Sequence, residues 1–279
     1  MTSPSGSRSN SAKRTSSAGG WTPKLVALDV DGTVVDHDGT LPEPVREAVG
    51  QLLDQGVRVV LATGRSWHGA VPVFEQLRLP PGPTVCSNGA VIVTHPPTEV
   101  VRSVTFDATE VVTKVLQRQP NTLVAVEEVG RGYRVSGDFP DGDLSGELII
   151  SDVAEMIAEP VTRVILRDPS STDEDFVRMA AELGLHGCSY FIGFSAWLDL
   201  VPEGVDKSSG LAEVAADMGI DRSEVLALGD GRNDIEMLTW AGRGVALGQA
   251  PPEVKAIADH VTGDFSDGGT VDELTRWIR

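Results

Sequence analysis

Two aspartates, Asp29 and Asp31, follow an apolar run of strand character and lead directly into a turn at Gly32. Alternate side chains of an extended strand share a face, and a turn at Gly32 lets both carboxylates converge beyond the strand end. Two carboxylates this close repel each other unless a cation or a shared proton lies between them. The alternative is a strand that ends in an ordinary Asp-Gly turn, which is common. The pair alone does not decide between a turn and a site.

A hydroxyl and a cation follow the next apolar run of the chain. Thr63, Gly64 and Arg65 come where the following helix is expected to begin, and helix N-termini are frequent anion sites. An N-cap threonine beside a surface arginine is the alternative. After the third apolar run, Asn88 and Gly89 belong to a turn that by itself indicates nothing more.

A second acidic group follows the apolar run over residues 225–229. Asp230 and Asp234 lie four residues apart, with Asn233 beside the second, at the start of another helix. Acidic residues favour a helix N-terminus, but capping accounts for only one of these carboxylates. Lys207 also precedes a helix, and a solvated charge is the ordinary alternative for a single lysine.

All of these groups follow predicted strands or precede helices, and this shared position indicates a single site. The carboxyl ends of parallel strands form one edge of a sheet, where ligands of such sheets bind. An aspartate pair, a threonine, a lysine and an Asp/Asn group at that edge supply a nucleophile, an acid/base, a hydroxyl donor, a cation and ligands for a hard divalent metal. This is the inventory for phosphoryl transfer to a carboxylate.

The elements that must position these residues alternate between strand and helix. Continuously apolar strands alternating with helices predict an α/β fold, with a parallel sheet covered on both faces. The expected strands span residues 24–31, 57–63, 84–87, 225–229 and 244–247, and the expected helices span 43–55, 67–77, 234–241, a segment after 252, and 271–278.

The segment between these halves differs, with longer and more alternating strand candidates. It predicts an α+β unit inserted at a strand end, where it can cover the site. Its expected strands span 122–129, 161–167 and 190–200, and its expected helices span 108–118, 151–157 and 173–183. The predicted organisation is a disordered tail over 1–20, a core domain over 21–90 and 204–279, and a cap domain over 91–203.

Composition narrows the class of protein. The 279 residues are 41% hydrophobic, enough for a large core, and carry a formal net charge of -18, which argues against nucleic acid or an anionic membrane surface as a partner. Only Cys86 and Cys188 are present, too few for a disulfide framework, so a cytoplasmic location is expected. No apolar run approaches the roughly 18 residues of a membrane span.

The ordered groups resemble the motifs of the haloacid dehalogenase superfamily of phosphohydrolases. The resemblance extends from about residue 24 to the C-terminus and is specific to the Cof-like branch, whose large α+β cap follows the third strand. It implies a three-layer, Rossmann-like core with a type IIB cap. Asp29-Val30-Asp31-Gly32-Thr33 matches the first motif, Thr63-Gly64-Arg65 the second, Lys207 the third, and Gly229-Asp230-Gly231-Arg232-Asn233-Asp234 the fourth.

The chain departs from the family pattern at two positions. Gln249 follows Gly248 where the family often has asparagine, which affects a loop beside the site. Asp206 precedes Lys207 where the family often has serine, so a carboxylate adjoins the expected cation and is expected to orient it or weaken it.

The resemblance implies a role for each matching residue. Asp29 would attack phosphorus to form an aspartyl-phosphate, and Asp31 would act as the acid and base. Lys207 would neutralise charge. Mg²⁺ would be held by Asp29, the main-chain carbonyl of Asp31 and Asp230, with Asp234 supporting that set. The expected phosphate and substrate contacts come from Thr63, Gly64, Arg65, Asn88, Gly89 and Asn233.

The resulting hypothesis is a Mg²⁺-dependent phosphatase of a small phosphorylated metabolite, such as a sugar phosphate or a phosphorylated cofactor. The alternatives are a phosphomutase or pathway-specific glycosyl-phosphate phosphatase of the same superfamily, and a non-catalytic binding module. The partner is expected to be the small-molecule substrate, with no nucleic acid or membrane, and the chain to be a monomer or a homodimer. The sequence does not identify the substrate.

The cap carries no motif that identifies its ligand. Its polar residues are expected to face water, because polar side chains on a half-buried sheet normally do, with Arg131, Tyr133 and Arg134 the best candidates for gripping an anion or a sugar. His37, His68, His95 and His260 show no metal-ligand spacing. The polar residues expected to be solvated are Glu127, Glu128, Arg131, Arg134, Arg163, Arg167 and His186.

Overall fold

The computed structural model describes residues 20–36, 38–140, 144–172, 174–175, 178–179, 182, 188–193 and 197–279. Apart from Gly20, the predicted tail lies outside these residues, as do His37, His186 and most of the helix predicted over 173–183. None of the described helices combines the length and the apolar character needed to cross a bilayer.

Strands and helices alternate in the two terminal parts of the chain, while strands dominate between them. The strands are β1 (Leu25–Leu28), β2 (Arg58–Leu61), β3 (Gly82–Cys86), β4 (Val91–His95), β5 (Glu99–Ser103), β6 (Leu123–Glu128), β7 (Gly132–Val135), β8 (Glu147–Ile150), β9 (Val164–Arg167), β10 (Cys188–Gly193), β11 (Trp197–Pro202), β12 (Val225–Gly229), β13 (Arg243–Ala246) and β14 (His260–Val261). The α-helices are α1 (Glu43–Asp54), α2 (Trp67–Gln76), α3 (Thr109–Arg118), α4 (Val153–Met156), α6 (Lys207–Asp217), α7 (Ile235–Trp240), α8 (Pro252–Ile257) and α9 (Gly269–Thr275).

The main sheet is parallel and has the order β14-β13-β12-β1-β2. Strand β1 lies between β12 and β2, with Leu25 opposite Val225 on one side and Arg58 on the other. All four residues of β1 are fully buried, because helices cover both faces of the sheet. The predicted α/β fold with a parallel sheet is confirmed.

Alternation along β1 divides the core into two apolar layers around the sheet. Val26 and Leu28 pack with the apolar residues of α1, α2 and α9, whereas Leu25 and Ala27 pack with those of α6, α7 and α8. The buried residues of α1 recur at helical spacing, and the chain leaves this helix at Gly56, whose φ of 79° is readily adopted only by glycine. The core therefore has the predicted three layers.

The third predicted strand does not continue the main parallel sheet as expected. Strand β3 pairs antiparallel with β4, and β4 pairs antiparallel with β5, in a separate three-stranded sheet. One parallel bridge between Ala62 and Val85 still places the end of β3 beside the end of β2. The residues after β3 therefore reach the same edge of the core.

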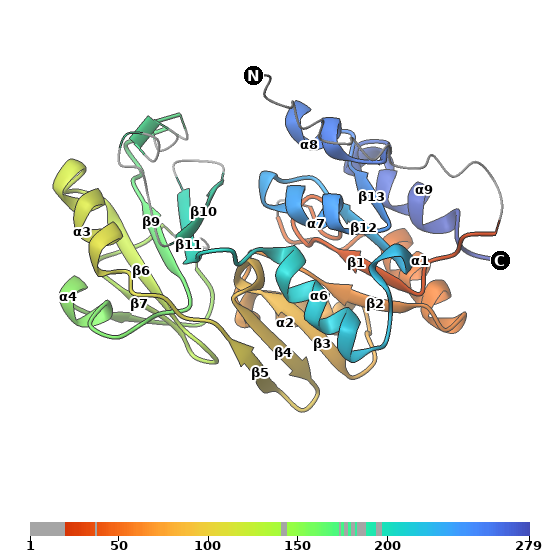
Figure 1. The fold of residues 1–279 in the computed structure, drawn as a ribbon, viewed down its shortest axis with the longest axis horizontal. Coiled ribbons are helices and arrows are strands. Elements are labelled where there is room, and N and C mark those ends of the chain that lie inside the picture. The colour runs from red at the N-terminus through yellow and green to blue at the C-terminus, as the bar shows by residue number, and fades with distance from the viewer. Residues whose placement is uncertain are drawn as a thin grey trace, which may run out of the picture.

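A six-stranded, mostly antiparallel sheet with the order β10-β11-β9-β6-β7-β8 lies beside the core, and α3 and α4 lie on its outer side (Figure 1). The α+β character expected here is confirmed, although the prediction of one strand over 190–200 is wrong because β10 and β11 pair antiparallel. Strands β4, β5, β7 and β8 were not predicted. The domain boundaries stay a prediction.

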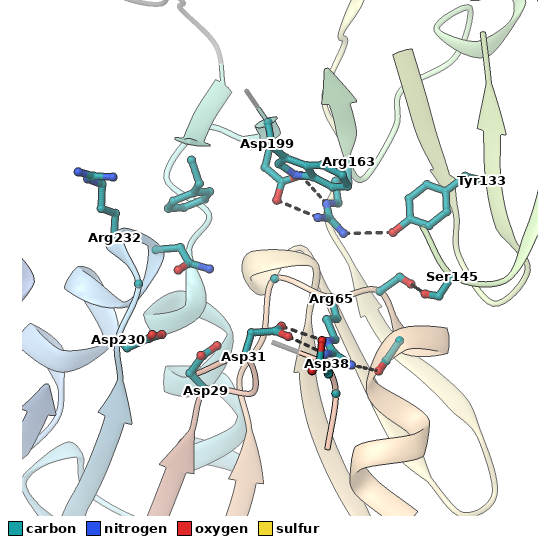
Figure 2. Close-up of a pocket in the computed structure, with 18 of the residues that line it drawn as sticks. Asp29, Asp31, Asp38, Arg65, Tyr133, Ser145, Arg163, Asp199, Asp230 and Arg232 are labelled. Carbon is teal, nitrogen blue, oxygen red and sulfur yellow. Dashed lines mark hydrogen bonds and ion pairs between the residues drawn. The ribbon is translucent and has the colours of Figure 1, made fainter. Parts of the chain in front are cut away.

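The two faces of this cap sheet differ in chemistry. Val124, Val164 and Leu198 belong to the apolar cluster that includes the buried residues of α3. Strand side chains alternate, so the intervening positions, which include Arg163 and Asp199, occupy the opposite face. That face lies toward the core (Figure 2).

Candidate active site

The ends of β1 and β12 bring two aspartates to the same edge of the core sheet. Asp29 directly follows β1, and its amide donates to the carbonyl of Leu228 at 3.0 Å. Asp230 directly follows β12. Because the two strands are parallel neighbours, residues far apart in the sequence become adjacent here.

Lys207, the first residue of α6, is completely buried between two carboxylates. Its Nζ donates to Oδ1 of Asp29 at 2.6 Å and to Oδ1 of Asp234 at 2.7 Å. The ordinary interpretation of a lone lysine as a solvated charge is therefore wrong for Lys207. Its ammonium therefore links α6 to the end of β1 and to the turn after β12.

Burial and charge set the protonation of this cluster. Burial, together with the charge of Asp234, raises the pKa of Asp29 to about 7, while Lys207 opposes the shift. Burial also raises the pKa of Asp234, again against the effect of Lys207. Burial acts to lower the pKa of Lys207, but the two carboxylates outweigh it and the pKa is raised. The lysine stays charged, and a further cation beside Asp29 would favour the carboxylate form.

Three carboxylates at this edge could hold a metal ion. Oxygens of Asp29, Asp230 and Asp234 lie within 4.8 Å of one another, and such oxygens suit Mg²⁺. Asp234 is also fixed from behind, since its Oδ2 accepts from the amides of Asp230 and Gly231 at 3.0 and 2.8 Å. The donor set fits a hard divalent cation, with Asp234 shared between that set and Lys207.

Gly32 and Gln249 shape the space around Asp230. Gly32 has a φ of 73°, and a Cβ there would lie 2.3 Å from Oδ2 of Asp230, so only glycine fits this turn. Nε2 of Gln249 donates to the carbonyl of Gly32 at 2.8 Å and to Oδ2 of Asp230 at 3.1 Å. The glutamine that departs from the family pattern thus orients an expected metal ligand.

Asp206 was expected either to orient or to weaken the cation of Lys207, and its hydrogen bonds fit the first of these effects. Its carboxylate caps α6 by accepting from the Ser209 amide at 2.9 Å and from the Ser208 hydroxyl at 2.6 Å. This capping box fixes the start of the helix that carries Lys207. Asp206 therefore acts on the lysine through the backbone and not through its charge.

Asp31 is half exposed and paired with Arg65. Nε and Nη2 of Arg65 donate to its two carboxylate oxygens at 3.0 and 2.5 Å, and Nη1 donates to the carbonyl of Gly69 at 3.0 Å. Arg65 was predicted to contact phosphate, and in this structure its guanidinium is occupied by Asp31. Asp31 remains beside the cavity described below.

The other predicted phosphate contacts come from the residues after β2, from the turn after β3 and from the turn after β12. Thr63 is fully buried, and its hydroxyl accepts from the amide of Arg65 at 3.0 Å. Nδ2 of Asn233 donates to Oδ1 of Asn88 at 3.0 Å. Gly64 lies against both asparagines, and a Cβ there would come within 3.1 Å of Asn88. Asn88, in the turn Ser87–Gly89, thus supports Asn233 from the side.

A cavity of about 580 Å³ opens between this edge and the cap sheet (Figure 2). Its volume is in the range of small-molecule sites. The core contributes Asp29, Asp31, Gly64, Arg65, Asp230 and Asn233 to the lining, and the cap contributes Tyr133, Ser145, Arg163, Phe191, Trp197 and Asp199.

The cap lining contains a buried ion pair. Arg163 donates from Nε and Nη2 to the two oxygens of Asp199, at 2.9 and 2.8 Å, and from Nη1 to the hydroxyl of Tyr133 at 3.2 Å. Tyr133 lies on β7, Arg163 directly before β9 and Asp199 on β11, and Glu127 on β6 lies between the strands of Tyr133 and Arg163. The pairing of the cap strands thus brings these four side chains into one row across the sheet.

Two of the cap residues that were expected to face water are buried. Glu127 is 7% exposed and Arg163 is 4% exposed, because both face the core and not water. Glu127 accepts from the hydroxyl of Ser87 at 2.6 Å, and Asp199 accepts from Nδ2 of Asn88 at 3.2 Å. The cap thus contacts the turn that supports Asn233.

The predicted anion-gripping residues of the cap divide between two environments. Tyr133 lines the cavity, as expected. Arg131 is exposed and paired with Glu147, and Arg134 pairs with Glu128; neither lines the cavity. The prediction for these two arginines is not supported by their positions. Sequence reasoning missed Asp199, Trp197 and Phe191, although the alternation of Trp197 and Asp199 along one strand was a usable signal.

Replacing Lys207 by methionine would leave Asp29 and Asp234 buried without their shared cation. We expect the free energy of unfolding at neutral pH to fall by about 3–5 kcal/mol, because breaking a buried ion pair leaves uncompensated charge. Urea unfolding measures the change. Lys114→Met is the control, since it breaks an exposed i,i+4 pair and is expected to cost less than ~1 kcal/mol. Similar losses in both variants would contradict the assigned role of Lys207.

Replacing Glu127 by glutamine should change how stability depends on pH. Burial raises the pKa of Glu127 in the folded protein, and Arg163 and Ser87 only partly oppose that. The folded state therefore binds a proton that the unfolded state has already released, so this residue reduces stability as pH rises from its unfolded pKa through its folded pKa. The variant should gain stability over the wild type across that window, as measured by urea midpoints at several pH values. Glu159→Gln, at an exposed position, controls for the loss of one charge; a parallel gain there would contradict the assignment.

Comparisons with known proteins identify the family of the chain. The model of the haloacid dehalogenase-like hydrolases matches residues 26–274. A similar curated protein is the 5-amino-6-(5-phospho-D-ribitylamino)uracil phosphatase YitU of Bacillus subtilis strain 168, which is 28% identical over 271 residues, covering 92% of this chain and 98% of that protein.

Solved structures agree with this result. A haloacid dehalogenase-like hydrolase from Bacteroides thetaiotaomicron has a TM-score of 0.76 at 27% identity, covering 91% of this chain and 99% of its own. A subclass IIB sugar phosphatase, BT4131, has a TM-score of 0.77 at 24% identity, covering 91% and 98%, and supports the fold with its cap. The resemblance inferred from the motifs is confirmed: the chain belongs to the haloacid dehalogenase-like hydrolases.

Proposed function

We propose that this hydrolase is a Mg²⁺-dependent phosphatase that cleaves a small phosphorylated metabolite through an aspartyl-phosphate on Asp29. The observation that carries the proposal is the convergence of the Asp29, Asp230 and Asp234 carboxylates with buried Lys207 beside a cavity. The name of the relative YitU, a phosphatase of a phosphorylated ribitylamino-uracil, supports a substrate of this size.

Asp29 is the nucleophile in this proposal. A free Oδ would attack phosphorus in line, and the alcohol would leave as Asp29 takes the phosphoryl group. Water would then attack the same phosphorus and release inorganic phosphate, restoring the carboxylate. Lys207 holds the other side of Asp29 through Oδ1, which fixes the direction of the attacking oxygen.

Asp31 is the acid and base. Its side chain lies at the cavity and is half exposed, and Arg65 holds both of its carboxylate oxygens. Donation of a proton to the leaving oxygen, and later removal of a proton from water, requires Asp31 to leave Arg65 during the reaction. Arg65 would then hold the resting position of this carboxylate.

The phosphoryl oxygens need donors and positive charge. Asn233, Gly64 and Arg65 line the cavity together with Asp29, and the buried hydroxyl of Thr63 accepts from the amide of Arg65. Mg²⁺ held by Asp29 and Asp230, with Asp234 in support, would neutralise charge on the phosphoryl group. Lys207 and the Mg²⁺ would supply the positive charge that offsets the aspartates of this site and the phosphoryl group.

Asp29→Asn tests the nucleophile. We expect phosphate release from an aryl phosphate in the presence of Mg²⁺ to fall by a factor of ~10⁴ or more, because the amide is a poor nucleophile. EDTA should abolish release by the wild type. Asp217→Asn, on the exposed side of α6, is the control and should retain full activity. Activity that survives Asp29→Asn would exclude the aspartyl-phosphate, and no release by the wild type from any phosphate ester would favour a binding module.

Asp31→Asn tests the acid and base with two leaving groups. We expect kcat to fall by about 10²–10⁴ for an alkyl phosphate, whose poor leaving group needs a proton. The loss should be smaller for an aryl phosphate. Steady-state rates for the two esters give the comparison, and equal losses would count against a proton donor at this position.

A further inference from the structure

Gln249, in the loop after β13, holds one oxygen of Asp230. Its Nε2 donates to Oδ2 of Asp230 at 3.1 Å and to the carbonyl of Gly32 at 2.8 Å. Its Oε1 accepts from the amide of Phe265 at 2.9 Å. A backbone amide can only donate, so the bond from Phe265 fixes which end of the carboxamide is oxygen and which is nitrogen. The donating end of Gln249 is therefore the one that faces Asp230.

The same oxygen of Asp230 is enclosed by the turn at Gly32. Gly32 is buried, and a Cβ there would lie 2.3 Å from Oδ2 of Asp230, so this oxygen occupies the space that a side chain at position 32 would need. The amide of Gly32 donates to the carbonyl of Val35 at 2.8 Å, which fixes the turn against which the oxygen lies. Oδ2 is thus held on two sides, by a backbone turn and by a carboxamide.

Each of the three carboxylates of the acidic cluster has an oxygen that accepts from a donor of the protein. Lys207 donates to Oδ1 of Asp29 and to Oδ1 of Asp234, and Gln249 donates to Oδ2 of Asp230. If Asp230 bound a cation through both oxygens, Oδ2 would have to turn away from Gln249. The hydrogen bond therefore favours binding of an ion through one oxygen of Asp230.

The number of oxygens that a carboxylate presents distinguishes divalent cations. Mg²⁺ requires near-octahedral geometry and keeps several of its waters, so one oxygen from each carboxylate is enough. The larger Ca²⁺ accepts roughly six to eight oxygens, including both oxygens of one carboxylate. A carboxylate that is restricted to one oxygen therefore suits Mg²⁺ better than Ca²⁺.

We propose that Gln249 is a positioning residue that limits Asp230 to one oxygen for the cation and thereby favours Mg²⁺ over Ca²⁺ at this site. The inference rests on the metal site of the proposed function. Gln249 acts through Asp230 and not as a ligand, because its Nε2 faces the carboxylate and its Oε1 accepts from Phe265.

Metal binding to the substrate-free protein tests the inference without relying on catalysis. The protein is treated with EDTA, dialysed, and titrated with MgCl₂ and with CaCl₂ by isothermal titration calorimetry. Gln249→Met keeps the length of the side chain but cannot donate, and its exposed position leaves the packing of the core intact. We expect the Kd for Mg²⁺ to rise about 10-fold, as for the loss of other hydrogen bonds to metal ligands. The Kd for Ca²⁺ should change less, so the ratio of the Kd for Ca²⁺ to that for Mg²⁺ should fall about 5-fold or more.

Gln55→Met is the matched control. The carboxamide of Gln55 also donates to a carbonyl, that of Gln51 at 3.1 Å, and accepts from a backbone amide, that of Arg279 at 3.0 Å. Gln55 is exposed and lies just before β2, at the edge of the sheet opposite the site, so this variant should bind both ions as the wild type does. The same ratio in Gln249→Met as in this control would overturn the inference. Failure of the wild type to bind Mg²⁺ would instead contradict the metal site of the proposed phosphatase.

Gln249→Glu tests the same idea through charge. A carboxylate at this position cannot donate to Oδ2 of Asp230, repels it, and adds a further oxygen that an ion can bind. We expect the ratio of the Kd for Ca²⁺ to that for Mg²⁺ to fall below the ratio of Gln249→Met in the same calorimetric titrations. A ratio at or above the wild-type value would overturn the inference.

Discussion

The buried contact of Lys207 with Asp29 and Asp234 is the constraint on which the site depends. An ammonium removed from water is costly, and it is compensated only where two carboxylates reach it with good geometry. That geometry requires the end of β1, the first turn of α6 and the turn after β12 to meet. The parallel pairing of β1 with β12 and the capping of α6 by Asp206 fix these three positions. The same arrangement leaves Asp230 beside Asp29, so an acidic cluster that could hold a metal ion forms as a consequence of the fold.

The cap depends on the core through a smaller set of polar contacts. Strand alternation places Glu127, Arg163 and Asp199 on one face of the cap sheet, and this face is the one turned toward the core. Ser87 and Asn88, from the turn after β3, hydrogen-bond to two of these residues. Buried polar groups without partners are costly, so these contacts favour the arrangement in which the cap covers the site.

The sequence predicted the core well because its signals are local. Each strand, turn and helix of the core is marked by an apolar run, a glycine or a helical repeat within a few residues. These local patterns also show which carboxylates come directly after a strand. The cap was predicted less well, since burial there depends on residues distant in the chain: Arg163 is buried because Asp199, 36 residues later, pairs with it. Glu127 likewise depends on Ser87, 40 residues earlier. Neither partner is visible in a local pattern, so both side chains were expected in water.

The core end and the cap end of the cavity differ in how their charges are paired. At the core end, carboxylates outnumber Lys207, and burial raises the pKa of Asp29, so a further positive charge there would favour its carboxylate form. At the cap end, Arg163 has its counter-charge in Asp199, and the buried carboxylate of Glu127 lies in the same row of the cap sheet. The two ends therefore differ in their balance of charge: Arg163 is paired within the cap, whereas the core end has more carboxylates than buried cations.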